Sequence, residues 1–167
     1  LVSGTGDTDN ASFGIAGASL NTAAVFNYEA KSSYAIRVRT TDAGGAFYEE
    51  ALTIAVQNGN EAPSDLTASA TTIAENAASG TNVGSLSSVD SDAGDTFTYA
   101  LVAGAGDTDN ASFIISGANL NTAASFNYEV KSSYSIRVRP TDAGGLPYEE
   151  PVPVSIINLN DAPTDLA

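Results

Sequence analysis

Apolar and polar side chains alternate along several short stretches of the chain. Over residues 134–138, Tyr, Ile and Val occupy every second position, and Ser and Arg lie between them. Residues 97–101 and 52–56 show the same period of two. This period is typical of β-strands that turn one face toward a core. Because no stretch keeps the helical period of 3.6 over three turns, the pattern predicts an all-β fold.

Short clusters of Gly, Asp, Asn and Ser separate the alternating stretches. Residues 92–95 read Asp-Ala-Gly-Asp, and residues 142–145 read Asp-Ala-Gly-Gly. Such clusters are turn signals, and about seven short strands within about 100 residues are typical of an Ig-like Greek-key β-sandwich. Pro151 and Pro153 lie two positions apart, so their missing N–H groups are on one side of the last strand. We therefore expect that strand to lie at a sheet edge there.

The sequence repeats itself at an offset of 100 residues without a gap. Residues 1–67 align with residues 101–167, and 45 of the 67 aligned positions are identical. This identity indicates two copies of one domain type in tandem. We expect residues 1–60 to be a repeat that lacks its N-terminal strands, and residues 61–167 to be a complete repeat with its exit linker.

The shortened first repeat predicts that the native polypeptide continues upstream with the missing strands. A sandwich that lacks strands exposes its core and an open sheet edge, which favours aggregation or the capture of a strand from a neighbour. On the alternative interpretation, preceding chain or a neighbouring subunit completes the sandwich within a long fibre. Both interpretations fit the repeat.

Two short polar segments that end in Pro mark the boundaries of the second repeat. Residues 58–63 read Asn-Gly-Asn-Glu-Ala-Pro, and residues 158–163 read Asn-Leu-Asn-Asp-Ala-Pro. Short exposed segments of this kind are typical of joints between domains. A joint of this length leaves little slack between neighbouring repeats.

The composition narrows the possible functions. The chain has 20 acidic and 6 basic residues and a net charge of −14, which disfavours nucleic acid because its phosphates would be repelled. No run of 18 apolar residues is present, so we expect no membrane insertion. Without His or Cys, the chain lacks the commonest general base and any thiol nucleophile. Paired carboxylates also perform glycoside hydrolysis, but a small sandwich implies no deep pocket, so we expect no enzyme.

The acidic residues recur at joints and turns, where they suit a divalent cation. Calcium takes about six to eight oxygen ligands from carboxylates, amides and backbone carbonyls. Asp90-Ser-Asp92 places two carboxylates on one side of the chain, and the joints add amide oxygens. Asp107 and Asp109 form a further acidic loop, for which a turn that caps a strand is favoured over a separate cation site. A solvated acidic surface is the default interpretation of the other carboxylates.

Taken in order, several segments resemble a cadherin repeat. They are Ile73-Ala-Glu-Asn76, Asp90-Ser-Asp92, Phe126-Asn-Tyr-Glu129, Thr141-Asp-Ala-Gly-Gly145 and Asn158-Leu-Asn-Asp-Ala-Pro163. The resemblance covers essentially all of residues 61–167 and, through the repeat, residues 1–60. The chain looks closest to the bacterial cadherin-like tandem repeats of very large secreted or cell-surface proteins, because Asn-Asp-Ala-Pro replaces the longer animal linker motif.

The resemblance implies that Ca²⁺ binds at the joints between repeats. For the joint inside this chain, the implied ligands are Asn27, Glu29, Asn58, Asn60, Glu61, Asp90, Asp92 and Asp142. For the exit joint, they are Glu75, Glu129, Asn158, Asn160 and Asp161. Asn27 stands where the family usually has Asp, and Glu61 also replaces Asp. These departures and the short linker predict fewer ions per joint or weak affinity.

The resemblance also implies a role for the whole segment. We expect a structural spacer in an extracellular adhesin or surface fibre, in which calcium stiffens the joints between repeats. Its partners would be adjacent repeats of the same polypeptide or neighbouring subunits. The alternative is a binding module, either for polysaccharide or for homophilic contact with like repeats.

Overall fold

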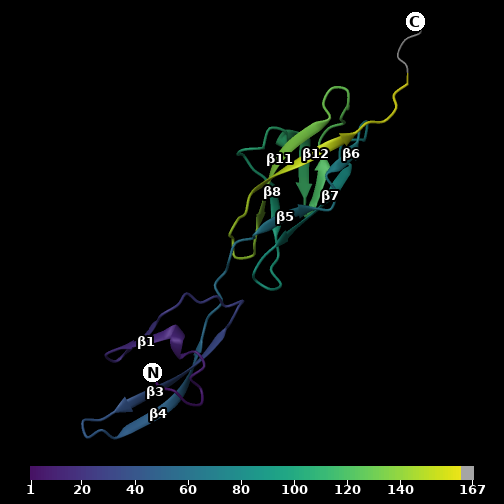
Figure 1. The fold of residues 1–167 in the computed structure, drawn as a ribbon. Helices are drawn as coiled ribbons and strands as arrows, with labels where there is room; N and C mark the ends of the chain where they lie inside the picture. The colour runs from purple at the N-terminus through teal and green to yellow at the C-terminus, as the bar shows by residue number, and fades with distance from the viewer. Residues whose placement is uncertain (163–167) are drawn as a thin grey trace. The chain divides into compact units, whose positions relative to one another are not determined.

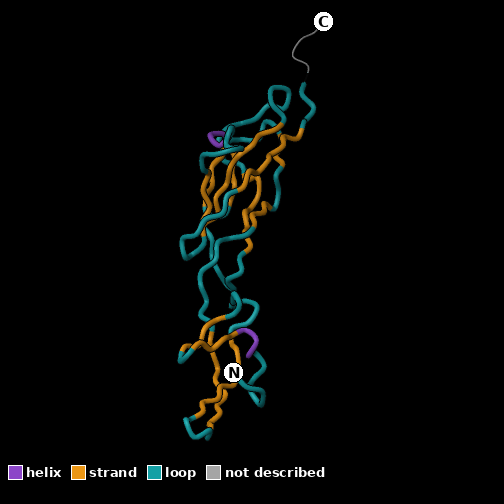
Figure 2. Tube along the Cα trace, turned by 60° about the vertical axis from the view of Figure 1, so that its left-hand side comes forward, coloured by secondary structure: helices purple, strands orange, loops and turns teal. Residues whose placement is uncertain are grey.

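The computed structural model describes residues 1–162 and divides the chain into two compact units. The first unit is Leu1–Gly59 and the second is Asn60–Ala167 (Figure 1). Strands and loops make up nearly all of both units, and the only helical segments in the described residues are two single 3₁₀ turns (Figure 2).

The second unit consists of two four-stranded sheets. In the first sheet the strand order is β5-β7-β10-β9, and every neighbouring pair is antiparallel. Its strands are β5 (Asp65–Ala68), β7 (Asn82–Val89), β10 (Asn119–Thr122) and β9 (Phe113–Ser116). The 3₁₀ turn η2 (Asn110–Ser112) leads directly into β9.

The second sheet has the order β6-β12-β11-β8. Its strands are β6 (Thr72–Ala74), β12 (Glu150–Ile157), β11 (Ser133–Thr141) and β8 (Thr98–Leu101). Strand β6 runs parallel to β12, whereas the other pairs are antiparallel. The two sheets form a β-sandwich, which confirms the all-β fold that the alternating pattern predicted.

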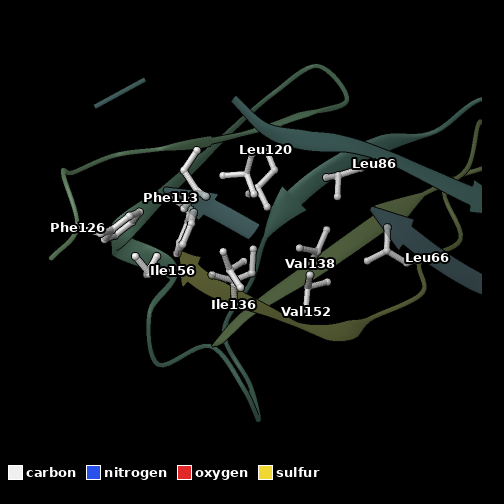
Figure 3. Packing of buried hydrophobic residues seen from close by; sticks show 12 residues of the cluster. Leu66, Leu86, Phe113, Leu120, Phe126, Ile136, Val138, Val152 and Ile156 are labelled. Carbon is white, nitrogen blue, oxygen red and sulfur yellow. The ribbon is translucent and has the colours of Figure 1, made fainter. Parts of the chain in front are cut away.

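The core of the second unit lies between the sheets. Every second residue of β12 is buried, and the same holds for Ile136 and Val138 of β11. Side chains from both sheets point toward one another (Figure 3). Leu120 of the first sheet and Val154 of the second have no exposed surface. The period of two in the sequence therefore marks the face that each strand buries.

Pro151 and Pro153 lie at the edge that their sequence predicted. Both residues pair with β11 on one side, while β6 pairs with β12 only from Ser155 to Ile157. The N–H of Ser155 points toward β6, donating to Thr71 O at 2.9 Å. Residues two and four positions earlier face the same way, so the missing N–H groups of Pro151 and Pro153 fall on the unpaired side.

The first unit has two separate antiparallel pairs. Strand β1 (Phe13–Ala16) pairs with β2 (Ser19–Thr22), and β3 (Ser33–Thr41) pairs with β4 (Phe47–Ala55). The 3₁₀ turn η1 (Asn10–Ser12) precedes β1. By sequence these strands correspond to β9, β10, β11 and β12, and the described residues of the first unit contain no counterpart of β5 to β8. That this unit is an incomplete domain stays a prediction.

Candidate metal centres

Three carboxylates gather at one end of the second unit. Asp90 and Asp95 lie in the loop between β7 and β8, and Asp142 follows β11. Each offers an oxygen, and the three oxygens lie within 4.8 Å of one another. Calcium–oxygen distances are about 2.3–2.6 Å, so oxygens at this spacing can share one ion. Sequence reasoning found Asp90 and Asp142 but missed Asp95, although Asp-Ser-Asp-Ala-Gly-Asp places it only three positions after Asp92.

Hydrogen bonds fix one oxygen of each of these carboxylates. Asp90 Oδ1 accepts from the N–H of Asp92 at 3.0 Å, and Asp95 Oδ1 accepts from the N–H of Thr96 at 2.7 Å. Asp142 Oδ1 accepts from the N–H of Leu146 at 2.7 Å. These contacts hold the loops in one arrangement, so the carboxylates are positioned by the backbone around them.

The other oxygens of Asp90 and Asp95 differ from those of ordinary buried carboxylates. Asp90 Oδ2 and Asp95 Oδ2 are buried and have no hydrogen-bond partner among the residues that the structure describes. Leaving a buried carboxylate oxygen unpaired is costly, and such atoms in native proteins usually have a partner, a water or an ion. The oxygen chemistry and the spacing of this cluster therefore fit a hard divalent cation.

Asn60 reaches the same cluster because residue 144 is glycine. Asn60 Nδ2 donates to Asp142 Oδ2 at 2.9 Å. A Cβ at Gly144 would lie only 2.2 Å from Asn60 Oδ1, so any larger residue would displace this amide. Gly44, the counterpart in the first unit, meets only Asp42 Oδ1 at 3.4 Å. The side chain of Asn60 thus packs directly against the Asp-Ala-Gly-Gly turn of residues 142–145.

A second cluster lies where the chain leaves the second unit. Glu75, Glu129 and Asp161 offer carboxylate oxygens within 4.8 Å of one another. Glu75 is almost completely buried, and its two oxygens accept from the N–H groups of Tyr128 at 2.8 Å and Leu159 at 2.7 Å. Glu75 therefore connects the turn after β6 to the loop before β11 and to the exit segment.

Local backbone geometry helps to hold this second cluster. Asn76 is the one described non-glycine residue with a positive φ, at 61°. Asn tolerates this left-handed conformation better than most residues do. Its N–H donates to Phe126 O at 2.9 Å. Asn158 Nδ2 donates to Glu129 Oε1 at 2.9 Å, which brings the predicted exit ligand Glu129 to the joint.

One carboxylate in each cluster, Glu75 or Asp142, has a lowered pKa. The N–H groups of Tyr128 and Leu159 hold the pKa of Glu75 below its ordinary value. Burial by itself raises the pKa of Asp142, but hydrogen bonds from Asn60 and the backbone around residue 145 outweigh it and lower that pKa. The lowered pKa values favour the charged forms of Glu75 and Asp142, and a divalent cation would neutralise this charge.

The remaining predicted ligands lie on both units. In the second unit, Asp92 Oδ2 accepts from the N–H of Glu61 at 3.0 Å. In the first unit, Asn27 Oδ1 accepts from the N–H of Ala30 at 2.6 Å, and Glu29 lies exposed in the next turn. Asn58 is also in the first unit. The joint site as a whole, which needs ligands from both units, stays a prediction.

The acidic loops around Asp9 and Asp109 have a structural role. Asp109 Oδ2 accepts from the N–H of Ser135 at 2.8 Å, and its Oδ1 pairs with Lys131. Asp9 makes the same contacts with Ala35 and Lys31. Each loop is thus a turn whose aspartate is bonded to a neighbouring strand, β3 or β11.

Comparison with known proteins decides the family. A family model for the cadherin domain matches residues 69–157, which is more than half of the chain. The chain belongs to the cadherin family. The cadherin fold is a non-enzymatic adhesion module, and this membership confirms the resemblance at the level of the family. No curated protein gives a significant sequence match.

Solved structures show the same fold. The human protocadherin-24 EC1-2 structure has a TM-score of 0.70 at 18% identity, covering 93% of this chain and 80% of that one. The structure of extracellular cadherin domains 1-4 of protocadherin gamma B7 has a TM-score of 0.63 at 24% identity, covering 85% of this chain and 36% of that one. The human desmocollin-1 ectodomain has a TM-score of 0.53 at 22% identity, covering 83% of this chain and 28% of that one. The cadherin chain described here therefore spans about a third of the length of the gamma B7 segment.

Proposed function

We propose that this cadherin segment is a spacer in an extracellular adhesin or surface fibre, and that calcium stiffens the joints between its repeats. The observation that carries the proposal is the cluster of Asp90, Asp95 and Asp142, in which two buried oxygens have no hydrogen-bond partner within residues 1–162. Calcium would be held there by these carboxylates, and Asn60 would help to position Asp142 through the hydrogen bond from its Nδ2. When bound, the ion bridges anions that otherwise repel one another.

The tandem repeat supports the spacer role. Clusters of carboxylates lie at both ends of the second unit, beside its entry segment and its exit segment. A cation at each end would restrict the joints and leave the sandwich between them unchanged. Extracellular modules bind calcium with dissociation constants of about 10⁻⁴–10⁻³ M, which suits an extracellular location, where calcium is abundant.

Calcium titration of the full chain tests this function. We expect calcium to raise the melting temperature of the second unit and to narrow the distribution of chain dimensions in small-angle scattering, relative to chelator. Asp95→Asn should weaken calcium binding by about tenfold or more because it removes one ligand charge. If calcium changes neither the melting temperature nor the chain dimensions, the proposal is wrong.

Glycine substitutions provide a matched control for the geometry of the site. Gly144→Ala should displace Asn60 from Asp142 and weaken calcium binding by about tenfold, the effect typical of lost supporting contacts around a metal. Gly44→Ala, at the equivalent position of the first unit, should leave calcium binding to the second unit unchanged. Isothermal titration calorimetry measures both. Equal affinities for the two variants would contradict the role of Asn60.

Homophilic contact is a second candidate function, supported by the family. One similar structure is described as a protocadherin gamma B7 cis-dimer. If like repeats associate, the mass of the chain in solution should rise with calcium and with protein concentration. If the mass stays that of a monomer in both conditions, homophilic contact is contradicted, and the spacer role is the one function that remains. A polysaccharide partner, the bacterial origin and the tandem context of the larger protein stay predictions.

The described residues contain no helix that is long and apolar enough to cross a bilayer. The similar structures are of extracellular domains by their descriptions. We include an extracellular or cell-surface location in the proposal on the strength of the family.

A further inference from the structure

A single Asn-Gly pair occurs in the sequence, and it lies just after the last strand of the first unit. Asn58 and Gly59 are both exposed, and residues 56–64, between β4 and β5, contain no helix or strand. The second repeat has Asn158 followed by Leu159 at the equivalent positions. The two repeats therefore differ in the residue that follows the same asparagine.

The residue after an asparagine decides whether the asparagine amide is stable. The backbone nitrogen of that residue can attack Cγ of the asparagine, but a side chain beside the nitrogen hinders the approach. Glycine has no Cβ and adopts backbone conformations that other residues avoid. Gly59 therefore presents no side-chain hindrance to attack on Asn58, and no strand fixes the backbone there.

The equivalent asparagine of the second repeat is exposed too, but its reacting groups are held in place. Asn158 Nδ2 donates to Glu129 Oε1 at 2.9 Å, and the N–H of Leu159 donates to Glu75 Oε1 at 2.7 Å. Leu159 also places a branched side chain beside the nitrogen that would attack. We therefore expect Asn158 to keep its amide, which makes it an internal control.

Asn110 shows an amide that is built into the fold. It begins the 3₁₀ turn η2, where its Nδ2 donates to Val102 O at 2.9 Å and its Oδ1 accepts from the N–H of Arg137 at 2.9 Å. Asn10 makes the equivalent contacts in the first unit. Rotation of such an amide toward the following backbone nitrogen would break both hydrogen bonds, so these asparagines are protected.

We propose that Asn58 is a site of spontaneous deamidation, at which an uncharged amide becomes a carboxylate without an enzyme. The nitrogen of Gly59 bonds to Asn58 Cγ and loses its proton to solvent, while the Cγ–Nδ2 bond breaks and ammonia leaves. Water then opens the resulting succinimide ring. Attack at Cγ gives aspartate, and attack at the main-chain carbonyl carbon gives isoaspartate. Water is the one co-reactant, and nothing is oxidised or reduced.

Either product changes the joint between the repeats. The new carboxylate has an ordinary pKa of about 3.3–3.9, so it is charged at neutral pH and adds to the negative charge of Glu61 nearby in the sequence. In isoaspartate the main chain also passes through Cβ, which lengthens this segment. Asn58 is a predicted calcium ligand, but its conversion does not rest on calcium. A chain that deamidates without binding calcium would contradict the proposed function alone.

Incubation of the full chain at mildly alkaline pH, in chelator, tests this site. Proteolysis at glutamate separates residues 51–61 from the segment that contains Asn158. We expect mass spectrometry to find conversion of amide to acid at Asn58 at a level about tenfold or more above that at Asn158 or Asn110, because only Asn58 precedes a residue without a Cβ. In water enriched in oxygen-18, the new carboxylate should carry the label.

A matched variant and a denatured sample serve as controls. Gly59→Leu, which introduces the residue of the second repeat, should lower conversion at Asn58 by about tenfold or more. In denaturant, Asn58 should convert within about threefold of its rate in the folded chain, since an exposed segment needs no unfolding to react. The proposal is overturned if Asn58 converts no faster than Asn158, if Gly59→Leu has no effect, or if folding slows conversion by more than this.

Discussion

Leu20 and Leu120 lie in nearly identical local sequences but in different surroundings. Leu120 is fully buried between two sheets, and Leu20 is 39% exposed at the open face of the first unit. The energy that a leucine contributes depends on the apolar area removed from water. The internal repeat therefore offers a matched pair in which the residue is constant and only the tertiary environment differs.

Substitution of these two leucines should have unequal effects. Leu120→Ala should destabilise the second unit by about 2–5 kcal/mol, because it leaves a cavity in a closed core. Leu20→Ala should destabilise the first unit by less than about 1 kcal/mol, since no closed core surrounds it. Urea denaturation followed by hydrogen-exchange mass spectrometry separates the two units. If both substitutions lower the free energy of unfolding of their units by the same amount, the exposure of Leu20 in the first unit is contradicted.

Asp95 shows the limit of motif reading at single residues. The repeated Asp-X-Asp pattern pointed to Asp90 and Asp92, and the family resemblance added Asp142. Asp95 ends the Asp-Ala-Gly-Asp segment of residues 92–95, which is interpreted from the sequence as a turn signal and not as a ligand. Only the folded loop brings its carboxylate within 4.8 Å of Asp90 and Asp142. The signal in the sequence was the position of Asp95, three residues after the candidate ligand Asp92.

At the scale of elements, β12 combines an edge and an interior segment. Its first part pairs only with β11, and its last three residues also pair with β6. Pro151 and Pro153 occupy the edge part, where a missing donor costs no hydrogen bond in the sheet. Prolines at an edge also prevent pairing with another chain. The first repeat has Ala51 and Thr53 at these positions.

Replacing one proline tests this edge. Pro153→Thr, which restores the residue of the first repeat, should change the free energy of unfolding by less than about 1 kcal/mol because no ladder bond is gained or lost. Val152→Asp, one position away on the buried face, should destabilise the second unit strongly. Thermal melting followed by circular dichroism compares them. If Pro153→Thr raises the melting temperature strongly, this side of β12 is paired and the edge assignment is wrong.

At the scale of the whole molecule, several carboxylates have lowered pKa values in the folded chain. Arg139 and Arg137 lower the pKa of Glu149, and Glu49 has the equivalent pair, Arg39 and Arg37. The pKa of Glu75 is also lowered, by the backbone N–H groups described above. A carboxylate with a lowered folded pKa stabilises the fold above its ordinary pKa and loses that contribution as pH falls through the folded value.

Acid should therefore destabilise the chain. Below the ordinary values of 4.5 for Glu and 3.8 for Asp, we expect the melting temperature to fall progressively in chelator. Glu149→Gln should reduce this dependence for the second unit, because its carboxylate no longer titrates. Melting curves from pH 7 to pH 3 at constant ionic strength measure the effect. A constant or rising melting temperature on acidification would contradict it.

The sequence by itself determined the elements and their inward faces. The period of two predicted the strands, the prolines predicted the edge, and the joint and turn motifs predicted the family and most of the acidic cluster residues. These features are local, because alternation, turn chemistry and missing donors act within a few residues of chain.

Only the tertiary structure decided which distant groups meet. It brought Asp95 to Asp142 and Asn60 to Gly144, and it left two carboxylate oxygens buried without a partner among the described residues. Burial and ligand geometry depend on strands far apart in the sequence, so nearly identical segments acquire different properties when different strands pack against them.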